Sequence, residues 1–252
     1  MRLTALDLAL LSAAILGFRH GFDYDHIAAI SDITSVELQP RRAMRMGLLY
    51  VLGHAATVAV LGGAVILFQR SLPSRMDGWA ERVVGLTLVL LGVYVLGTMI
   101  RNREHLDHFR PQTRAAILIG ALDWLSWRTR RVFGSGPAER VRRAEDSYSR
   151  KSVFLIGVIH GLGAETPSQL LLFLLAANLG GLWRGFLGLG MFLAGLLVMN
   201  TLMTASAVGI FGASARKPHL LRWVMGFTAA YSLVVGVIFL FGSAAILPPL
   251  GG

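Results

Sequence analysis

Six long apolar stretches dominate this sequence, and they restrict the chain to folds that cross a membrane. Each stretch is long enough to traverse the roughly 30 Å of hydrocarbon in a bilayer as a helix. The pattern predicts an all-α fold, a polytopic integral membrane helical bundle of about six transmembrane helices. The predicted spans cover residues 4–35, 43–69, 79–100, 151–178, 185–212 and 219–246.

The composition agrees with a membrane location. Hydrophobic residues make up 54% of the chain, charged residues make up only 15%, and the mean hydropathy is +0.61. Soluble domains carry about 25% charged residues. The chain has no cysteine, which excludes disulfides and thiolate metal ligands. We expect no cleavable signal peptide, because the first apolar stretch leads into a charged motif and not into a small-residue cleavage site.

The formal net charge of +10 is concentrated in the connections between spans. Nearly all basic residues fall in segments 41–45, 101–151 and 216–222, as the positive-inside rule produces for cytoplasmic loops. We therefore predict a multi-pass protein of the inner (cytoplasmic) membrane, with basic loops in the cytoplasm and both termini on the other side. Since the lipid bilayer explains this charge pattern, we expect no nucleic-acid partner. The sequence leaves open whether the chain forms a homo-oligomer.

The two halves of the chain resemble each other. His20-Gly21-Phe22 followed by Asp25 returns 140 residues later as His160-Gly161-Leu162 followed by Glu165. Two further sequence features of the first half return in the second half, 141 and 142 residues later. Each half holds three spans, so the second half must cross the membrane in the opposite direction. Inverted repeats of this kind are typical of secondary transporters, whose sites lie near the membrane midplane between the halves.

This symmetry predicts three regions. Residues 1–100 form the first three-helix repeat, with a His/Asp motif in its first span. Residues 101–150 form an Arg-rich cytoplasmic linker, and residues 151–252 form the second three-helix repeat.

A charged run interrupts the first apolar stretch, at residues 19–26 (Arg-His-Gly-Phe-Asp-Tyr-Asp-His). An Asp or Arg in the middle of a span costs roughly 2.5 to 3.5 kcal/mol, so this run indicates a function at membrane depth. The alternative is a structural polar network, in which Arg19 pairs with Asp23 or Asp25 and the histidines bond to the backbone.

The histidines and acids of this run form a candidate metal-ligand set. His20, Asp23 and His26 are three residues apart and would share one face of a helix. Asp25 points elsewhere unless the helix is distorted near Gly21. Imidazole and carboxylate ligands together suit Ni²⁺, Co²⁺ or Zn²⁺.

The second span contributes a further candidate ligand. His54 lies one turn from Thr57 in otherwise apolar sequence. A lone His in this setting is more often a satisfied core residue, but beside the first motif it becomes a candidate third imidazole.

The fourth span carries polar residues around a predicted helix break. Gly163 and Pro167 flank Glu165, the only acid in the membrane region of the second half. Proline removes a backbone donor and disturbs the preceding turn, so we expect the helix to break here. Glu165 is a candidate ligand, gate or proton carrier; alternatively it is neutralised by protonation or by Arg19.

Three of these segments resemble the nickel/cobalt transporter family of secondary metal permeases. Segment 19–27 is similar to the family signature of a His, four residues and then Asp-His. Segment 53–58 is similar to the second signature, and segment 161–169 to the third. The chain departs from the family pattern at Gln169, where the family usually has Glu, and in the fourth segment, which survives only as Gly190-Met191.

The resemblance implies high-affinity uptake of Ni²⁺ or Co²⁺ through a helical bundle. The positions that it assigns are His20, Asp25 and His26 in the first signature, His54 in the second, and Glu165 and Thr166 in the third.

We therefore predict secondary transport of a divalent transition-metal cation, with nickel or cobalt as the transported substrate and no prosthetic group. The predicted metal ligands are His20, Asp23, Asp25, His26, His54 and Glu165. Thr57, His160, Thr166 and Gln169 are further candidates along the substrate path.

The alternative function is a membrane-embedded enzyme. His20 and Asp25 have the spacing of a His/Asp acyltransferase dyad, in which His is the general base. His20, His26 and His54 around Zn²⁺ would suit a metallohydrolase. No nucleophile motif accompanies either set, and an inverted repeat has no role in either enzyme, so we predict a protein that is not an enzyme. A purely structural membrane scaffold is the remaining alternative.

Overall fold

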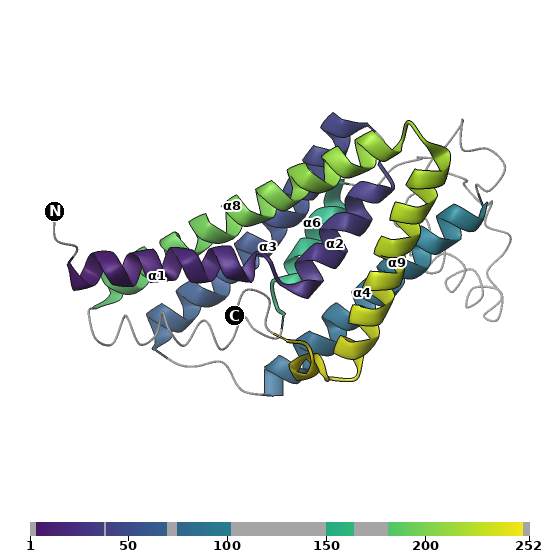
Figure 1. Cartoon of the computed structure of the whole chain (residues 1–252). Coiled ribbons are helices and arrows are strands. Elements are labelled where there is room, and N and C mark those ends of the chain that lie inside the picture. Colours follow the sequence, from purple (N-terminus) through teal and green to yellow (C-terminus); the bar gives the residue numbers. More distant parts are fainter. Residues whose placement is uncertain (1–3, 38, 70–74, 102–149, 164–180, 249–252) are drawn as a thin grey trace, which may run out of the picture.

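The computed structural model describes residues 4–37, 39–69, 75–101, 150–163 and 181–248, and within these ranges it is helical, without a strand (Figure 1). The helices are α1 (Ala5–His20), α2 (Tyr24–Ser35), α3 (Pro40–Phe68), α4 (Arg75–Arg101), α6 (Arg150–His160), α8 (Leu182–Ser214), α9 (Pro218–Leu240) and the short 3-10 helix η2 (Ala244–Ile246).

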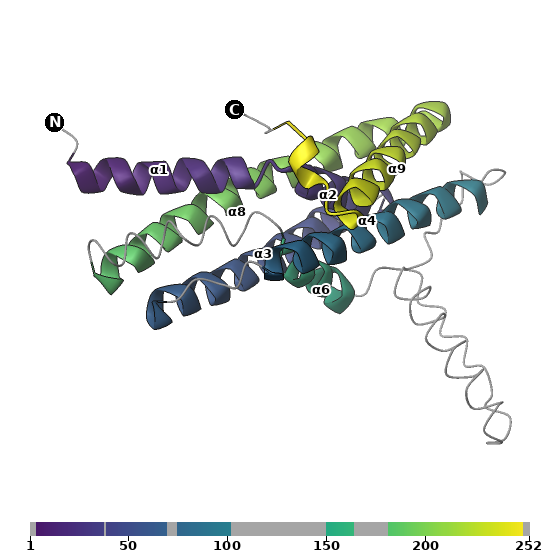
Figure 2. The ribbon, with the colours of Figure 1, turned by 90° about the horizontal axis from the view of Figure 1, so that it is seen from below.

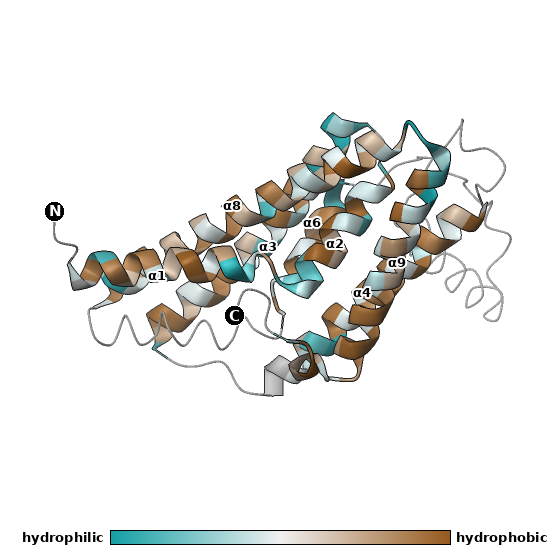
Figure 3. Cartoon of the chain, in the orientation of Figure 1, coloured by the Kyte–Doolittle hydropathy of each residue, from teal (hydrophilic) through white to brown (hydrophobic). Residues whose placement is uncertain are grey.

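Four of the described helices are long and apolar enough to cross a membrane: α3, the segment Gly78–Ile100 of α4, α8 and α9. Their surfaces are largely hydrophobic (Figure 3). Large apolar side chains such as Val60, Trp183 and Phe227 are 70%, 73% and 73% exposed. An apolar surface of this extent suits contact with lipid. The prediction of a membrane protein built from helices is therefore confirmed.

The first predicted span is two helices and not one. α1 starts at a capping box, in which Thr4 and Asp7 bond each other's backbone N–H groups, and it ends at His20. Asp23 then adopts an extended backbone as the N-cap of α2. The break includes Gly21, where the sequence had suggested a distortion. The expectation that His20, Asp23 and His26 share the face of one continuous helix is wrong for this reason.

A second helix ends in the same short motif. α6 stops at His160, and Gly161 begins a turn, so this helix ends before the predicted break between Gly163 and Pro167. Pro167 itself lies outside the described residues. A His-Gly pair thus closes both α1 and α6.

The helices pack in pairs, α1 with α8, α3 with α6 and α4 with α9. Glycines permit the first two crossings. A Cβ on Gly17 would overlap the Phe192 carbonyl of α8, and a Cβ on Gly157 would overlap the Tyr50 carbonyl of α3. Small residues at such points let helix backbones approach closely.

The first two crossings use residues that correspond in number. Gly17 and Gly157 differ by 140, and their contacts Phe192 and Tyr50 differ by 142. The reciprocal contacts follow the same offsets, since Gly195 meets the Ala14 carbonyl and Gly53 meets the Phe154 carbonyl. The α1/α8 and α3/α6 crossings are therefore built alike.

Helix α2 lies in the middle of the molecule, between the α1/α8 pair and the α4/α9 pair (Figures 1 and 2). It packs against α3, α4, α8 and α9. Most of its residues are buried, and Ala28, Ala29 and Ile33 are fully so. This short central helix places polar side chains at its N-terminus deep inside the bundle.

Candidate metal-binding site

Three histidines from three helices converge at the break between α1 and α2. His20 is the last residue of α1, His26 lies in the first turn of α2, and His54 lies in α3. One nitrogen of each ring lies within 4.8 Å of the others. His26 and His54 are fully buried, and His20 is 5% exposed. We call these three residues the histidine cluster.

The turn between α1 and α2 brings two members of the cluster together. The ring centroids of His20 and His26 are 5.1 Å apart, and those of His26 and His54 are 4.3 Å apart. Because the helix is interrupted at Gly21–Asp23, His20 and His26 lie on either side of the break. Sequence reasoning placed these residues together for a different reason, their spacing on one helix.

His20 is held on both sides of its ring. Its Nδ1 lies 2.8 Å from Oδ2 of Asp23, and its Nε2 lies 3.3 Å from Nε2 of His54. A carboxylate on one imidazole nitrogen orients the ring and raises its basicity as a ligand. In a tetrahedral site with metal–nitrogen bonds of about 2.0–2.1 Å, neighbouring nitrogens are about 3.3–3.4 Å apart. The His20–His54 separation has this length, so an ion that replaced the proton between the two Nε2 atoms could be shared by both rings.

His26 is oriented by an amide from the other half of the chain. Its Nδ1 lies 3.0 Å from Oδ1 of Asn200 in α8. With the carbonyl oxygen of Asn200 as acceptor, Nδ1 carries the proton and Nε2 carries the lone pair.

Two ring nitrogens of the cluster are buried without a hydrogen-bond partner in the described part of the chain, Nε2 of His26 and Nδ1 of His54. Unsatisfied buried polar atoms are rare in proteins. Neutral imidazoles with available lone pairs are ligands that Ni²⁺, Co²⁺ and Zn²⁺ accept. The chemistry of the donor set therefore fits a divalent transition-metal cation as cargo.

The two carboxylates of the motif lie in different places. The carboxylate of Asp23 lies next to the cluster, where it contacts the ring of His20. Asp25 accepts a hydrogen bond of 3.0 Å from the backbone N–H of His26, and its Oδ2 lies 3.7 Å from where a Cβ on Gly163 would be. Asp25 is thus buried at the edge of the cluster, next to the end of α6.

The structural alternative, Arg19 paired with an acid of the motif, is not what the described residues show. Arg19 is exposed. Among these residues the carboxylate of Asp23 contacts the ring of His20, and the ion pair between an arginine and an acid joins Arg42 to Glu37.

His160 is not part of the histidine cluster and uses both ring nitrogens in other contacts. Nδ1 is 3.1 Å from the Tyr50 hydroxyl, and Nε2 is 2.6 Å from Oγ1 of Thr87. The Thr87 hydroxyl lies 2.7 Å from the Val84 carbonyl, to which it donates, so it accepts from Nε2–H while Nδ1 accepts from Tyr50. His160 therefore links α3, α4 and α6 in this arrangement.

Of the remaining candidates, Thr57 has a described contact and the other three lie outside the described residues. Thr57 donates to the Val158 carbonyl at 3.0 Å, which ties α3 to α6. Glu165, Thr166 and Gln169 lie outside the described residues.

Three residues that contact the predicted site residues are not in the predicted set: Asn200, Tyr50 and Thr87. Asn200 carried a usable signal, because it is the only side-chain amide in the apolar segment 182–214. Tyr50 and Thr87 are common in membrane helices and offered no comparable signal.

Comparisons with known proteins point to one family. The chain is 25% identical to the urease accessory protein UreH of Bacillus sp. (strain TB-90), over 90% of this chain and 88% of UreH. It is 32% identical to the cobalt transport protein NhlF of Rhodococcus rhodochrous, over 66% of this chain and 48% of NhlF. It is 27% identical to the high-affinity nickel transport protein of Cupriavidus necator, over 95% of this chain and 71% of that protein.

No family model and no solved structure matches the chain. The chain spans about half the length of NhlF and about 70% of the nickel transport protein. The similarity to these relatives covers most of the chain and includes the segments that carry the histidine cluster. The chain is therefore a divergent member of the nickel/cobalt transporter family.

Proposed function

We propose that this protein is a secondary transporter that takes up a divalent transition-metal cation, nickel or cobalt, across the cytoplasmic membrane. The observation that carries the proposal is the cluster of three buried imidazoles with nitrogens within 4.8 Å of one another. The metal is the transported substrate, and the transport chemistry requires no prosthetic group.

The cluster would hold the ion as follows. His20, His26 and His54 supply neutral nitrogen ligands, and Asp23 holds the His20 ring in place through its Nδ1 contact. The negative charge of Asp25, buried beside the cluster, offsets part of the charge of a divalent cation. Protons compete with a metal for imidazole nitrogens, so binding links the occupancy of the site to pH.

The architecture that would move the ion is a pair of inverted three-helix repeats, residues 1–100 and 151–252, joined by a linker at 101–150. Its support is the correspondence between the α1/α8 and α3/α6 crossings, whose contacts repeat at offsets of 140 and 142. Rocking of one such repeat against the other is a common basis of alternating access.

The proposed substrate path extends from the cluster toward the end of α6. Asp25 faces Gly163 there, and Glu165, Thr166 and Gln169 follow in sequence. In the proposed repeat, Glu165 is the counterpart of Asp25, which makes it a candidate ligand during passage of the ion. Thr57 and His160 line the α3/α6 side of this region.

We assign the basic end of the bundle to the cytoplasm. Arg41, Arg42 and Arg45 start α3, Arg150 starts α6, and Arg216 and Lys217 connect α8 to α9. The positive-inside rule places such segments on the cytoplasmic side, and both termini then lie on the opposite side.

The enzyme alternative is disfavoured by the geometry of the proposed dyad. His20 contacts Asp23 and not Asp25, while Asp25 binds the His26 backbone. The His/Asp pair that an acyltransferase would need is therefore not formed. The relatives described above are named as transport or accessory proteins, which also favours transport.

The test is metal binding by the purified protein, measured by calorimetry and elemental analysis with Ni²⁺, Co²⁺ and Zn²⁺. We expect about one ion per chain, with binding lost in His26→Ala and in His54→Ala. His219→Ala, an exposed position in the first turn of α9, is the matched control and should bind like wild type. Cells that express either cluster variant should accumulate less metal than cells that express wild type or the His219→Ala control. Unchanged binding in both cluster variants would contradict the proposal.

A further inference from the structure

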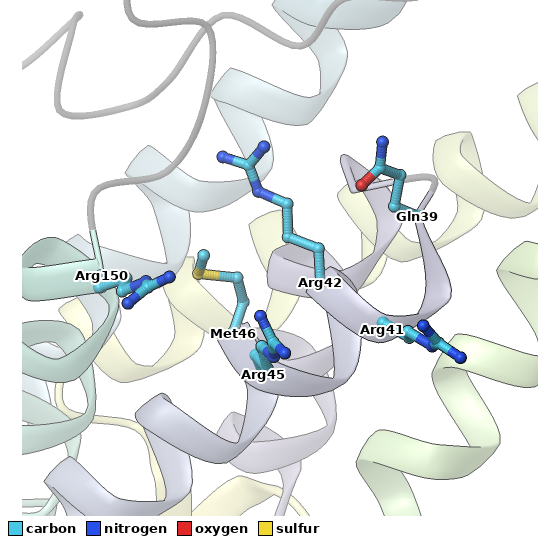
Figure 4. Close-up of a pocket in the computed structure, with 6 residues that line it drawn as sticks. All are labelled: Gln39, Arg41, Arg42, Arg45, Met46 and Arg150. Carbon is cyan, nitrogen blue, oxygen red and sulfur yellow. The ribbon is translucent and has the colours of Figure 1, made fainter.

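A cavity of about 460 Å³ lies at the basic end of the bundle, away from the histidine cluster (Figure 4). Two helices form it, because its lining comes from the start of α3 and from the first residue of α6. The lining residues are Gln39, Arg41, Arg42, Arg45, Met46 and Arg150. Figure 4 shows Arg150 reaching toward Met46 from α6, with Arg42 and Arg45 extending from α3. We call this cavity the arginine pocket.

The pocket has basic side chains where the start of a helix usually has acidic ones. The N-terminus of a helix carries a partial positive charge and favours acidic side chains. The first turns of α3 and α6 contain no acid, and Gln39, the N-cap of α3, makes no side-chain hydrogen bond to the helix. The N-terminus of α3, the first described turn of α6 and four guanidinium groups thus meet around one space.

Little negative charge balances this arrangement. Glu37 binds Arg42 with a Nε–Oε2 distance of 2.8 Å, and its other oxygen accepts from the backbone N–H of Gln39 at 3.2 Å. Among the described residues, Arg41, Arg45 and Arg150 form no ion pair. Within the described part of the chain, the pocket therefore has a surplus of positive charge, carried mainly by exposed arginine side chains that lie around one space.

We propose that the arginine pocket binds a phosphate group, as carried by an anionic lipid headgroup or by free phosphate. Guanidinium groups form paired, charge-assisted hydrogen bonds to phosphate oxygens. Basic pockets between transmembrane helices on the cytoplasmic side are suited to lipid headgroups, and the pocket lies where α3 leaves its apolar segment. Both sources share this phosphate chemistry.

A ligand in the pocket would join α3 to α6. The same two helices cross at Gly53 and Gly157, where each backbone contacts the other closely. Helix α3 carries His54, and α6 carries His160 bonded to Tyr50 of α3. A bound phosphate would therefore stabilise the helix pair that holds one ligand of the histidine cluster, without touching the cluster itself.

The test is native mass spectrometry of the full-length protein in detergent, with added phosphatidylglycerol or phosphatidylcholine. Thermal unfolding with and without inorganic phosphate tests the second source. The pocket variant is Arg45→Gln with Arg150→Gln. Its control is Arg216→Gln with Lys217→Gln, which removes the same charge from exposed positions outside the pocket.

We expect wild type and control to retain phosphatidylglycerol over phosphatidylcholine, and the pocket variant to retain it at least about tenfold less, as when charge-assisted hydrogen bonds are lost. Stabilisation of wild type and control by inorganic phosphate, without lipid retention, would support the site and assign it to free phosphate. Equal retention by pocket variant and control, with no effect of phosphate, would overturn the proposal. Metal binding by both variants serves as the check that they are folded.

Discussion

The orientation of single side chains decides whether the histidine cluster can accept a cation. Asn200 accepts from Nδ1 of His26 and so leaves Nε2 of that ring for a ligand. Asp23 acts in the same way on His20. Outer partners that fix the tautomer of a ligand histidine are worth about 10–100-fold in metal affinity, so Asn200 should matter although it offers no nitrogen lone pair of its own.

We predict that Asn200→Ala weakens Ni²⁺ or Co²⁺ binding by about 10–100-fold, whereas Asn200→Asp restores most of the affinity, because a carboxylate also accepts from Nδ1–H. Calorimetry on the purified variants measures the effect. Thr201→Ala, at the next position, is the control. If alanine and aspartate at position 200 had the same effect, Asn200 would be a packing residue and not a positioning one.

The sequence was sufficient to name His20, His26 and His54, because ionisable residues in apolar stretches are costly and stand out. It was not sufficient to name their partners. Asn200 lies 174 residues from His26, and its role depends on how α8 packs beside α2. Helical spacing also predicted that Asp23 and Asp25 point in different directions. Which of the two carboxylates lies at the cluster depends on the break at Gly21, and the periodicity of the sequence does not determine the path of the backbone there.

Helices in this bundle are positioned by close backbone contacts at glycines. At Gly157 a Cβ would overlap the carbonyl of Tyr50, and at Gly53 a Cβ would overlap the carbonyl of Phe154. Backbone atoms cannot rotate away as a side chain can, so any larger residue there must separate the helices. Apolar length predicted α3, α4, α8 and α9 well, since length is a local property. The pairing of helices depends on which glycines meet, and this could not be predicted from each span alone.

We predict that Gly157→Ala lowers the stability of the protein by about 1–3 kcal/mol, the usual cost of overpacking. Gly190→Ala is the matched control, because position 190 in α8 is exposed and a Cβ there would meet nothing within 4 Å. The control should be neutral or stabilised by up to about 1 kcal/mol, the helix preference of alanine over glycine. Thermal unfolding in detergent compares the two. Equal melting temperatures would show that the α3/α6 crossing can relax around an added methyl group.

At the scale of the whole molecule, the two proposed repeats differ in the contacts that their corresponding histidines, His20 and His160, make. In the proposed repeats His20 and His160 occupy equivalent positions, and each lies beside an aromatic ring of a long helix, Phe192 at 5.6 Å and Tyr50 at 5.5 Å between centroids. The Tyr50 hydroxyl bonds to His160, whereas Phe192 has no hydroxyl. The His20 ring is therefore left to contact Asp23 and His54.

The inverted architecture and its orientation can be tested through the chain's lack of cysteine, because any single cysteine introduced is the only site for a thiol reagent. Ala215 follows α8 and Ala245 lies beyond α9, and both are exposed. At about 1.5 Å per residue, α9 is long enough to separate them by a bilayer. We expect a membrane-impermeant maleimide to label Ala245→Cys in right-side-out vesicles and Ala215→Cys only in inside-out vesicles. The unmodified chain, which should not react, is the control, and retained metal binding shows that each variant is folded. Labelling of both positions from one side would mean that α9 does not cross the membrane, and the reverse pattern would place the arginine pocket outside the cell.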